Sequence, residues 1–122
     1  MREPASSLLK DRRVLVVEDE YMMADDLRRD LEKFGAHVVG PVARVSDALS
    51  LLGSEDTLDG VILDVNLGGE KVFPVADALR ARGIRFVFST GYDEWALPDA
   101  YKDVPRCEKP IDLPRVAQAL FG

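Results

Sequence analysis

The sequence has very few of the residues that build disulfides and soft-metal sites. Its 122 residues include one cysteine, Cys107, and one histidine, His37. A single cysteine excludes an internal disulfide and fits a reducing compartment, so we expect a cytoplasmic protein. Zinc and other soft metals need clusters of Cys and His that this chain does not contain. A lone histidine on a short edge strand is expected to be a surface residue rather than a catalytic one.

Long apolar runs and basic runs are also missing. No stretch approaches the roughly 20 apolar residues of a membrane span, and residues 1–10 lack the apolar segment of a signal peptide. The formal net charge of −6, from 16 basic and 22 acidic side chains, argues against a nucleic-acid surface. We therefore expect neither membrane contact nor direct nucleic-acid binding. The length and a hydrophobic content of 47% predict one domain over residues 1–122, with residues 1–11 as a flexible arm.

Short apolar runs alternate with helical patterns along the chain. The expected strands cover residues 14–17, 36–40, 61–64, 86–88 and 104–108. The expected helices cover residues 21–34, 46–52, 73–82 and a last segment after Asp112. Residues 93–103 are ambiguous, because Pro98 interrupts the helical spacing of Trp95, Leu97 and Tyr101. Alternating strands and helices predict a doubly wound α/β domain with a five-stranded parallel sheet and right-handed crossovers.

Polar residues recur where these strands end. Glu18 and Asp19 follow the first strand, Asp64 ends the third, and Thr90 and Lys109 follow the last two. The carboxyl ends of parallel strands share one edge, where ligands bind, so these residues are expected in one crevice. Acids at the start of a helix are also favoured by the helix dipole alone. That alternative explains one or two acids after the first strand, but not the same pattern at Asp64.

The predicted crevice suits one kind of chemistry. Several carboxylates and a backbone carbonyl favour Mg²⁺, while a hydroxyl and an ammonium can bind phosphoryl oxygens. A central carboxylate can itself act as a nucleophile and form an aspartyl phosphate. The loop at Gly68 and Gly69 lacks the lysine pattern of a nucleotide-binding P-loop. The residues therefore predict Mg²⁺-dependent phosphoryl transfer to Asp64.

Four segments resemble the signature of a known family. VLVVEDE, VILDVNLGG, VFSTGY and CEKP are similar to those of the receiver domain of two-component response regulators, over Arg13 to the C-terminus. The resemblance implies a flavodoxin-like (βα)5 fold, phosphorylated by a sensor histidine kinase or a histidine phosphotransfer protein. It implies Mg²⁺ on Glu18 (through water), Asp19, Asp64 and the Asn66 carbonyl, with Thr90 and Lys109 on the phosphoryl group. It also implies a cis bond between Lys109 and Pro110.

The chain departs from many receivers at two places. Arg106 stands where they carry Tyr or Phe three positions before the lysine. Residues 88–92 are instead similar to a receiver subgroup with a Phe-Ala-Thr-Gly-hydrophobic-Tyr motif, although this chain has Ser89 and lacks the extra hydrophobic position. Switching by coupling of Thr90 to Tyr92 is therefore left open. No output domain is included, so the chain is either a single-domain regulator or a fragment.

Two other functions use similar residues. A Mg²⁺-dependent aspartate-nucleophile phosphatase carries an acid two residues after its nucleophile, whereas this chain has Asn66, which has no carboxylic proton to donate. A degenerate receiver would act only as a binding module, but all the expected site residues are present. We favour a phosphoacceptor that switches partner binding and catalyses only its own phosphorylation and dephosphorylation.

Overall fold

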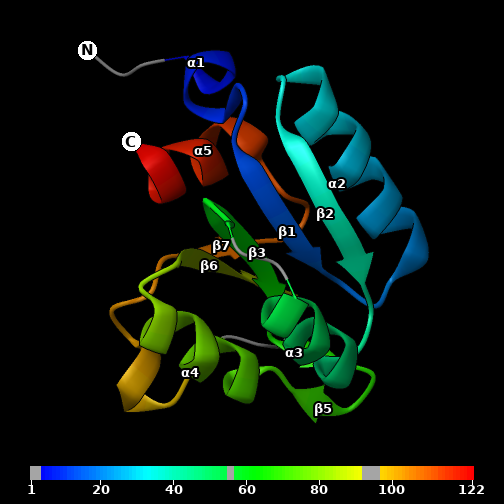
Figure 1. The fold of residues 1–122 in the computed structure, drawn as a ribbon, viewed down its shortest axis with the longest axis vertical. Helices are drawn as coiled ribbons and strands as arrows, with labels where there is room; N and C mark the ends of the chain where they lie inside the picture. Colours follow the sequence, from blue (N-terminus) through cyan, green and yellow to red (C-terminus); the bar gives the residue numbers. More distant parts are fainter. Residues whose placement is uncertain (1–3, 55–56, 92–96) are drawn as a thin grey trace.

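The computed structural model, which describes residues 4–54, 57–91 and 97–122, has a five-stranded parallel sheet with helices on both faces (Figure 1). The strands are β1 (Arg13–Val17), β2 (His37–Val42), β3 (Gly60–Asp64), β6 (Arg85–Thr90) and β7 (Arg106–Glu108), in the order β2-β1-β3-β6-β7. The helices are α1 (Ala5–Leu9), α2 (Tyr21–Lys33), α3 (Val45–Ser54), α4 (Phe73–Arg82) and α5 (Leu113–Phe121). This arrangement confirms the predicted flavodoxin-like fold. Among the described residues, no helix has both the length and the apolar character needed to cross a membrane.

The strands alternate their side chains between two apolar cores. Leu15 and Leu63 join the core beneath α3 and α4, whereas Val16 and Ile62 join the core beneath α1, α2 and α5. Every residue of β3 is buried, because this central strand has helices on both faces and a strand on each side. Continuous apolar runs are typical of such strands. Burial of β3 on both faces fixes the position of Asp64, its last residue.

The N-terminal segment differs from its prediction. Residues 1–11 were expected to be a flexible arm, but Ala5–Leu9 form α1, which lies beside α5 in Figure 1. Leu8 and Leu9 are buried in the core that α5 shares, and the Arg12 guanidinium lies 4.6 Å from the centre of the Phe121 ring. Two buried leucines and a cation–π contact give this short segment enough contacts to pack on the domain.

Smaller differences occur along the sheet. The second strand was expected to close at Gly40 and Pro41, but β2 continues to Val42 through a cis Gly40–Pro41 bond. Pro41 is tolerated there because β2 is an edge strand. Within residues 97–103, part of the segment that the sequence left ambiguous, the structure has a short 3₁₀ helix, η1 (Asp99–Tyr101). Trp95, which belongs to the helical spacing of that segment, and Tyr92, whose coupling to Thr90 was left open, lie outside the described residues.

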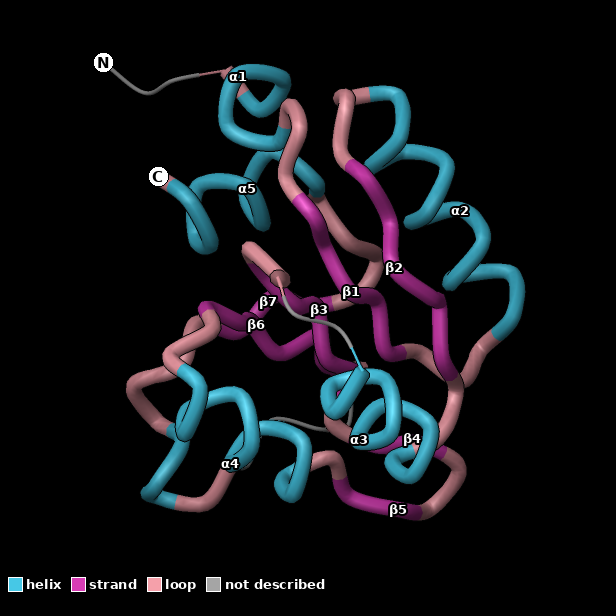
Figure 2. Tube along the Cα trace, in the orientation of Figure 1, coloured by secondary structure: helices cyan, strands magenta, loops and turns pink. Residues whose placement is uncertain are grey.

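A two-stranded hairpin lies between β3 and α4. Its strands β4 (Asn66–Leu67) and β5 (Glu70–Lys71) pair antiparallel and form a sheet of their own. Figure 2 shows the hairpin below the five-stranded sheet, next to α3. The sequence predicted only a glycine-containing loop in this region, so the hairpin is a new element at the carboxyl edge.

Candidate functional site

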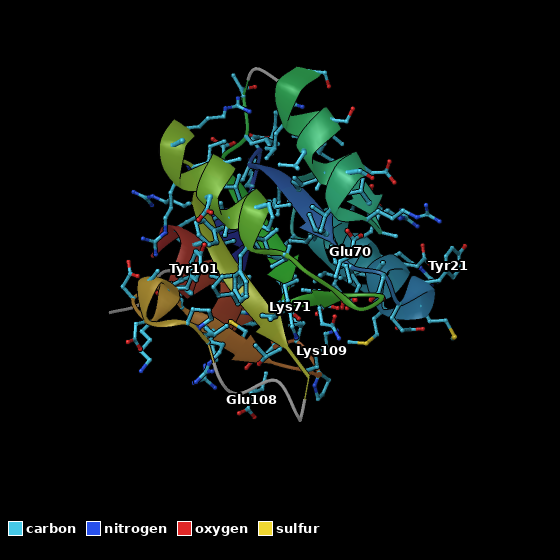
Figure 3. All side chains as sticks on the ribbon, turned by 90° about the horizontal axis from the view of Figure 1, so that it is seen from below. Tyr21, Glu70, Lys71, Tyr101, Glu108 and Lys109 are labelled. Atoms are coloured by element: carbon cyan, nitrogen blue, oxygen red, sulfur yellow. The ribbon has the colours of Figure 1, made fainter. Side chains whose placement is uncertain are left out.

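Four strands deliver polar residues to the carboxyl edge of the sheet, which Figure 3 views from below. Glu18 and Asp19 follow β1, Asp64 ends β3, Thr90 ends β6 and Lys109 follows β7. The strands pair in parallel register, so their ends lie at the same level. The predicted polar residues therefore lie together at one edge of the sheet.

Lys109 joins two buried acids at the centre of this edge. Its Nζ lies 2.8 Å from Glu18 Oε1 and 2.9 Å from Asp64 Oδ2. The two carboxylate side chains are only 6% and 4% exposed, so both are withdrawn from water. Burying a charge is costly unless an opposite charge lies close to it, and here one ammonium serves two carboxylates.

The shared lysine changes the acidity of the site. The pKa of Glu18 is raised to about 7, mainly by burial and next by the neighbouring Asp64, against the opposing effect of Lys109. Burial of the Lys109 ammonium acts to lower its pKa, but the hydrogen bonds that the ammonium donates to Glu18 and Asp64 outweigh burial and raise it. Lys109 therefore stays charged near neutral pH.

Asp19 completes a group of three acids. Glu18, Asp19 and Asp64 can each offer one oxygen such that the three atoms lie within 4.8 Å of one another. Asp19 is exposed, whereas the other two are buried, so the group opens to solvent on one side. Carboxylate oxygens at this spacing are the donors that a hard divalent cation prefers. The acids present therefore fit a magnesium ion.

Asn66 and Thr90, the two remaining predicted residues, are linked to Asp64 and Lys109 by hydrogen bonds that involve backbone groups. The Asn66 N–H donates to Asp64 Oδ1 at 3.2 Å, and the Lys109 N–H donates to the Thr90 carbonyl at 2.9 Å. Thr90 is buried, and the Lys109–Pro110 bond is cis, as the family resemblance implied. All six predicted residues thus lie at one edge.

A cavity lies beside two of these acids, Glu18 and Asp19. It has a volume of about 420 Å³ and lies between the first turns of α2 and the end of β2. Glu18 and Asp19 form one wall, and Tyr21, which is 80% exposed, stands at the rim. Glu20 turns away from the acid group and accepts a hydrogen bond from the Met23 N–H at 2.8 Å, which caps α2.

One contact at the site could not be read from side-chain types. The Gly68 N–H, at the tip of the β4–β5 hairpin, donates to Asp19 Oδ2 at 2.7 Å. Every residue except proline carries a backbone N–H, so no pattern in the sequence marks this donor. The contact depends on the folded path of the hairpin.

The chain is similar in sequence and fold to known proteins that include response regulator receiver domains. No family model matches the chain. The solution structure of SdrG from Sphingomonas melonis Fr1 is 42% identical, with a TM-score of 0.80 over 90% of this chain and 93% of that one. A response regulator receiver domain (CheY-like) from Methylobacillus flagellatus is 27% identical, with a TM-score of 0.73 over 85% and 91% of the two chains.

A curated relative extends the comparison to sensory proteins. The sensory transduction protein LytT of Bacillus cereus is 34% identical over 112 residues, which are 88% of this chain and 45% of LytT. The chain thus spans about half the length of the curated relatives it matches. The fold, the edge that carries the acids and these similarities lead to one conclusion: the chain belongs to the receiver domain family of two-component response regulators, which accept phosphoryl groups in signalling.

Proposed function

We propose that Asp64 is the residue that receives the phosphoryl group. The observation that supports it best is the pairing of Lys109 Nζ with both buried carboxylates, which holds Asp64 at the end of β3. A carboxylate oxygen of Asp64 attacks phosphorus of a phosphohistidine, and a P–O bond forms as the P–N bond breaks. The electron pair of the broken bond stays on the imidazole nitrogen of the donor.

The metal ion in this proposal is Mg²⁺. Glu18 (through water), Asp19, Asp64 and the Asn66 carbonyl would hold it, in keeping with the close acid group of the structure. Bound there, Mg²⁺ supplies positive charge that stabilises the phosphoryl oxygens during transfer. It would also relieve the repulsion among three acids, only two of which contact Lys109.

Lys109 and Thr90 are proposed to bind the transferred group. Lys109 already reaches Asp64, so its ammonium can pair with a phosphoryl oxygen attached to that carboxylate. The Thr90 hydroxyl would donate to another phosphoryl oxygen. Because the Lys109 N–H is bonded to the Thr90 carbonyl, the two residues are held together by their backbones.

The proposed donor is a sensor histidine kinase or a histidine phosphotransfer protein, as in other receivers. Residues 1–122 would act as one receiver domain that alters the binding of a downstream protein partner. The chain would catalyse only its own phosphorylation and dephosphorylation, in the cytoplasm. Any activity carried by the further length of relatives such as LytT lies beyond this proposal.

Phosphorylation by acetyl phosphate tests the assignment directly. With Mg²⁺, intact-protein mass should show one added phosphoryl group, which Asp64→Asn should abolish while the fold is kept, because Asn is nearly isosteric with Asp. Asp59→Asn is a matched control, since Asp59 lies at the other end of β3 and accepts from the Arg13 N–H at 2.8 Å. Unchanged uptake by Asp64→Asn would disprove the assignment, and sustained turnover of a phosphate monoester would indicate a phosphatase.

A further inference from the structure

The β4–β5 hairpin touches acids from two different strands through its backbone. The Gly68 N–H donates to Asp19 Oδ2 at 2.7 Å, across 49 positions of sequence. At the base of the same hairpin, the Asn66 N–H donates to Asp64 Oδ1 at 3.2 Å. The hairpin thus links the acid that follows β1 to the acid that ends β3. Each contact engages one oxygen of its carboxylate.

The hairpin is also held by contacts that do not involve these acids. The Val72 N–H donates to the Val65 carbonyl at 3.1 Å and closes the base of the hairpin. Leu67 and Val72 are buried in the core beneath α3 and α4, which anchors both sides. At the tip, the Gly69 N–H donates to Asn66 Oδ1 at 3.2 Å. The Gly68 N–H is therefore held in place by packing and by hydrogen bonds of the hairpin itself.

Asp19 has more freedom than its two neighbours. It is exposed, whereas Glu18 and Asp64 are buried and pair with Lys109. Among the contacts described for the Asp19 side chain, the Gly68 N–H is the one that fixes an oxygen. A donor that holds one carboxylate oxygen leaves the other directed to a ligand, and such outer contacts tune metal affinity by about 10- to 100-fold.

We propose that Gly68 is a positioning residue whose backbone N–H orients Asp19 for Mg²⁺. This inference rests on the proposed function, because it takes Asp19 as a metal ligand. The tip suits the role, since Gly68 has φ +56° and Gly69 has φ +94°, conformations that glycine adopts without strain. Proline at position 68 would remove the donor and could not adopt this φ.

Amide hydrogen exchange in the metal-free protein tests the contact. Asp19→Ala should speed the exchange of the Gly68 amide and leave that of Gly69 unchanged. Asn66→Ala should do the reverse, because Asn66 Oδ1 accepts from Gly69. When Mg²⁺ is added to the wild-type protein, the Gly68 amide should stay protected. Equal exchange of Gly68 in wild type and Asp19→Ala, or loss of its protection when Mg²⁺ binds, would overturn the proposal.

Magnesium affinity separates positioning from a purely structural role. Gly68→Pro should weaken Mg²⁺ binding about tenfold, measured by titration of the folded protein. Gly68→Ala is also strained at φ +56°, but it keeps the N–H, and its added Cβ would lie 3.7 Å from Asp19 Oδ2, an ordinary contact distance. Because both variants carry backbone strain and only Gly68→Pro loses the donor, Gly68→Ala should weaken binding less. Equal affinities for the two variants would overturn the inference. Should Gly68→Pro not fold, the exchange experiment still decides.

The proposed function fails in a different way. If Asp19→Ala binds Mg²⁺ as tightly as wild type, Asp19 is not a ligand and the proposed metal site is wrong. If Asp19→Ala loses Mg²⁺ while Gly68→Pro keeps it, the metal site stands and only the role of Gly68 is wrong.

Discussion

The two edges of the sheet use charge in opposite ways. At the carboxyl edge, Glu18 and Asp64 are buried and share the single ammonium of Lys109. At the amino edge, three guanidinium groups donate to backbone carbonyls: Arg12 to Leu8, Arg82 to Leu52 and Arg85 to Leu120. The carboxyl edge brings together two carboxylates that repel each other. At the amino edge, each guanidinium group instead binds a neutral carbonyl oxygen.

The acceptors at the amino edge lie in the last turns of three helices. Leu8, Leu52 and Leu120 belong to the ends of α1, α3 and α5. The final carbonyls of a helix lack partners within the helix and carry the negative end of its dipole. A guanidinium there stabilises the fold. The carboxyl edge instead carries the proposed magnesium and phosphorylation site, so contacts that stabilise the fold and the proposed site lie at opposite ends of the same strands.

The largest effect should follow from removing the shared cation. Lys109→Met should destabilise the metal-free protein by about 3 kcal/mol, because breaking a buried ion pair leaves charge without a partner. Urea unfolding measures the loss. Adding Asp64→Asn should recover part of it, since one of the two buried charges is then gone.

Lys102→Met is the control for that experiment. Lys102 pairs with Asp99 at 2.8 Å, but both side chains are exposed, so little change is expected. If Lys109→Met were as stable as Lys102→Met, the buried carboxylates of Glu18 and Asp64 would not need the lysine. The proposed difference between the two edges would then be wrong.

The next effect concerns magnesium and stability. At about one hundred times its Kd, Mg²⁺ should stabilise the wild-type protein by about 2.7 kcal/mol, since it binds the folded state. Asp19→Ala should lose most of this gain. Glu20→Ala should keep the gain but lower stability with and without the ion by about 1 kcal/mol, because Glu20 caps α2. Thermal melts with and without Mg²⁺ measure both, and equal losses of the gain would mean that the acids are misassigned.

The smallest effect is expected at the amino edge. Arg85→Met should cost about 1 kcal/mol, the scale of one hydrogen bond to a helix end, and should leave phosphorylation by acetyl phosphate unchanged. Arg115→Met, at an exposed position of α5, is the comparison variant. A change in phosphoryl uptake by Arg85→Met would show that the two edges are coupled.

Local sequence patterns predicted most of the fold and the placement of most residues of the candidate site. The apolar runs around Val16, Ile62 and Val87 marked central strands, because burial on both faces demands apolar residues in succession. The acids and the lysine then followed from their places at strand ends. Packing of α1 could not be predicted, since Leu8 and Leu9 gain their burial from residues of α5 more than one hundred positions away. The contact of the Gly68 N–H with Asp19 could not be predicted either, because the backbone N–H is present in every residue except proline and leaves no mark in the sequence.

The packing of α1 on α5 also bears on where the domain starts. The motifs that resemble receivers begin at Arg13, and a boundary drawn there would strip Leu8 and Leu9 from the core and expose the apolar surface of α5 beneath them. The structural unit is therefore longer than the segment that carries these motifs. Any segment joined upstream of Ala5 would emerge beside α5, at the end of the sheet opposite Asp64, which separates the attachment point from the proposed phosphorylation site.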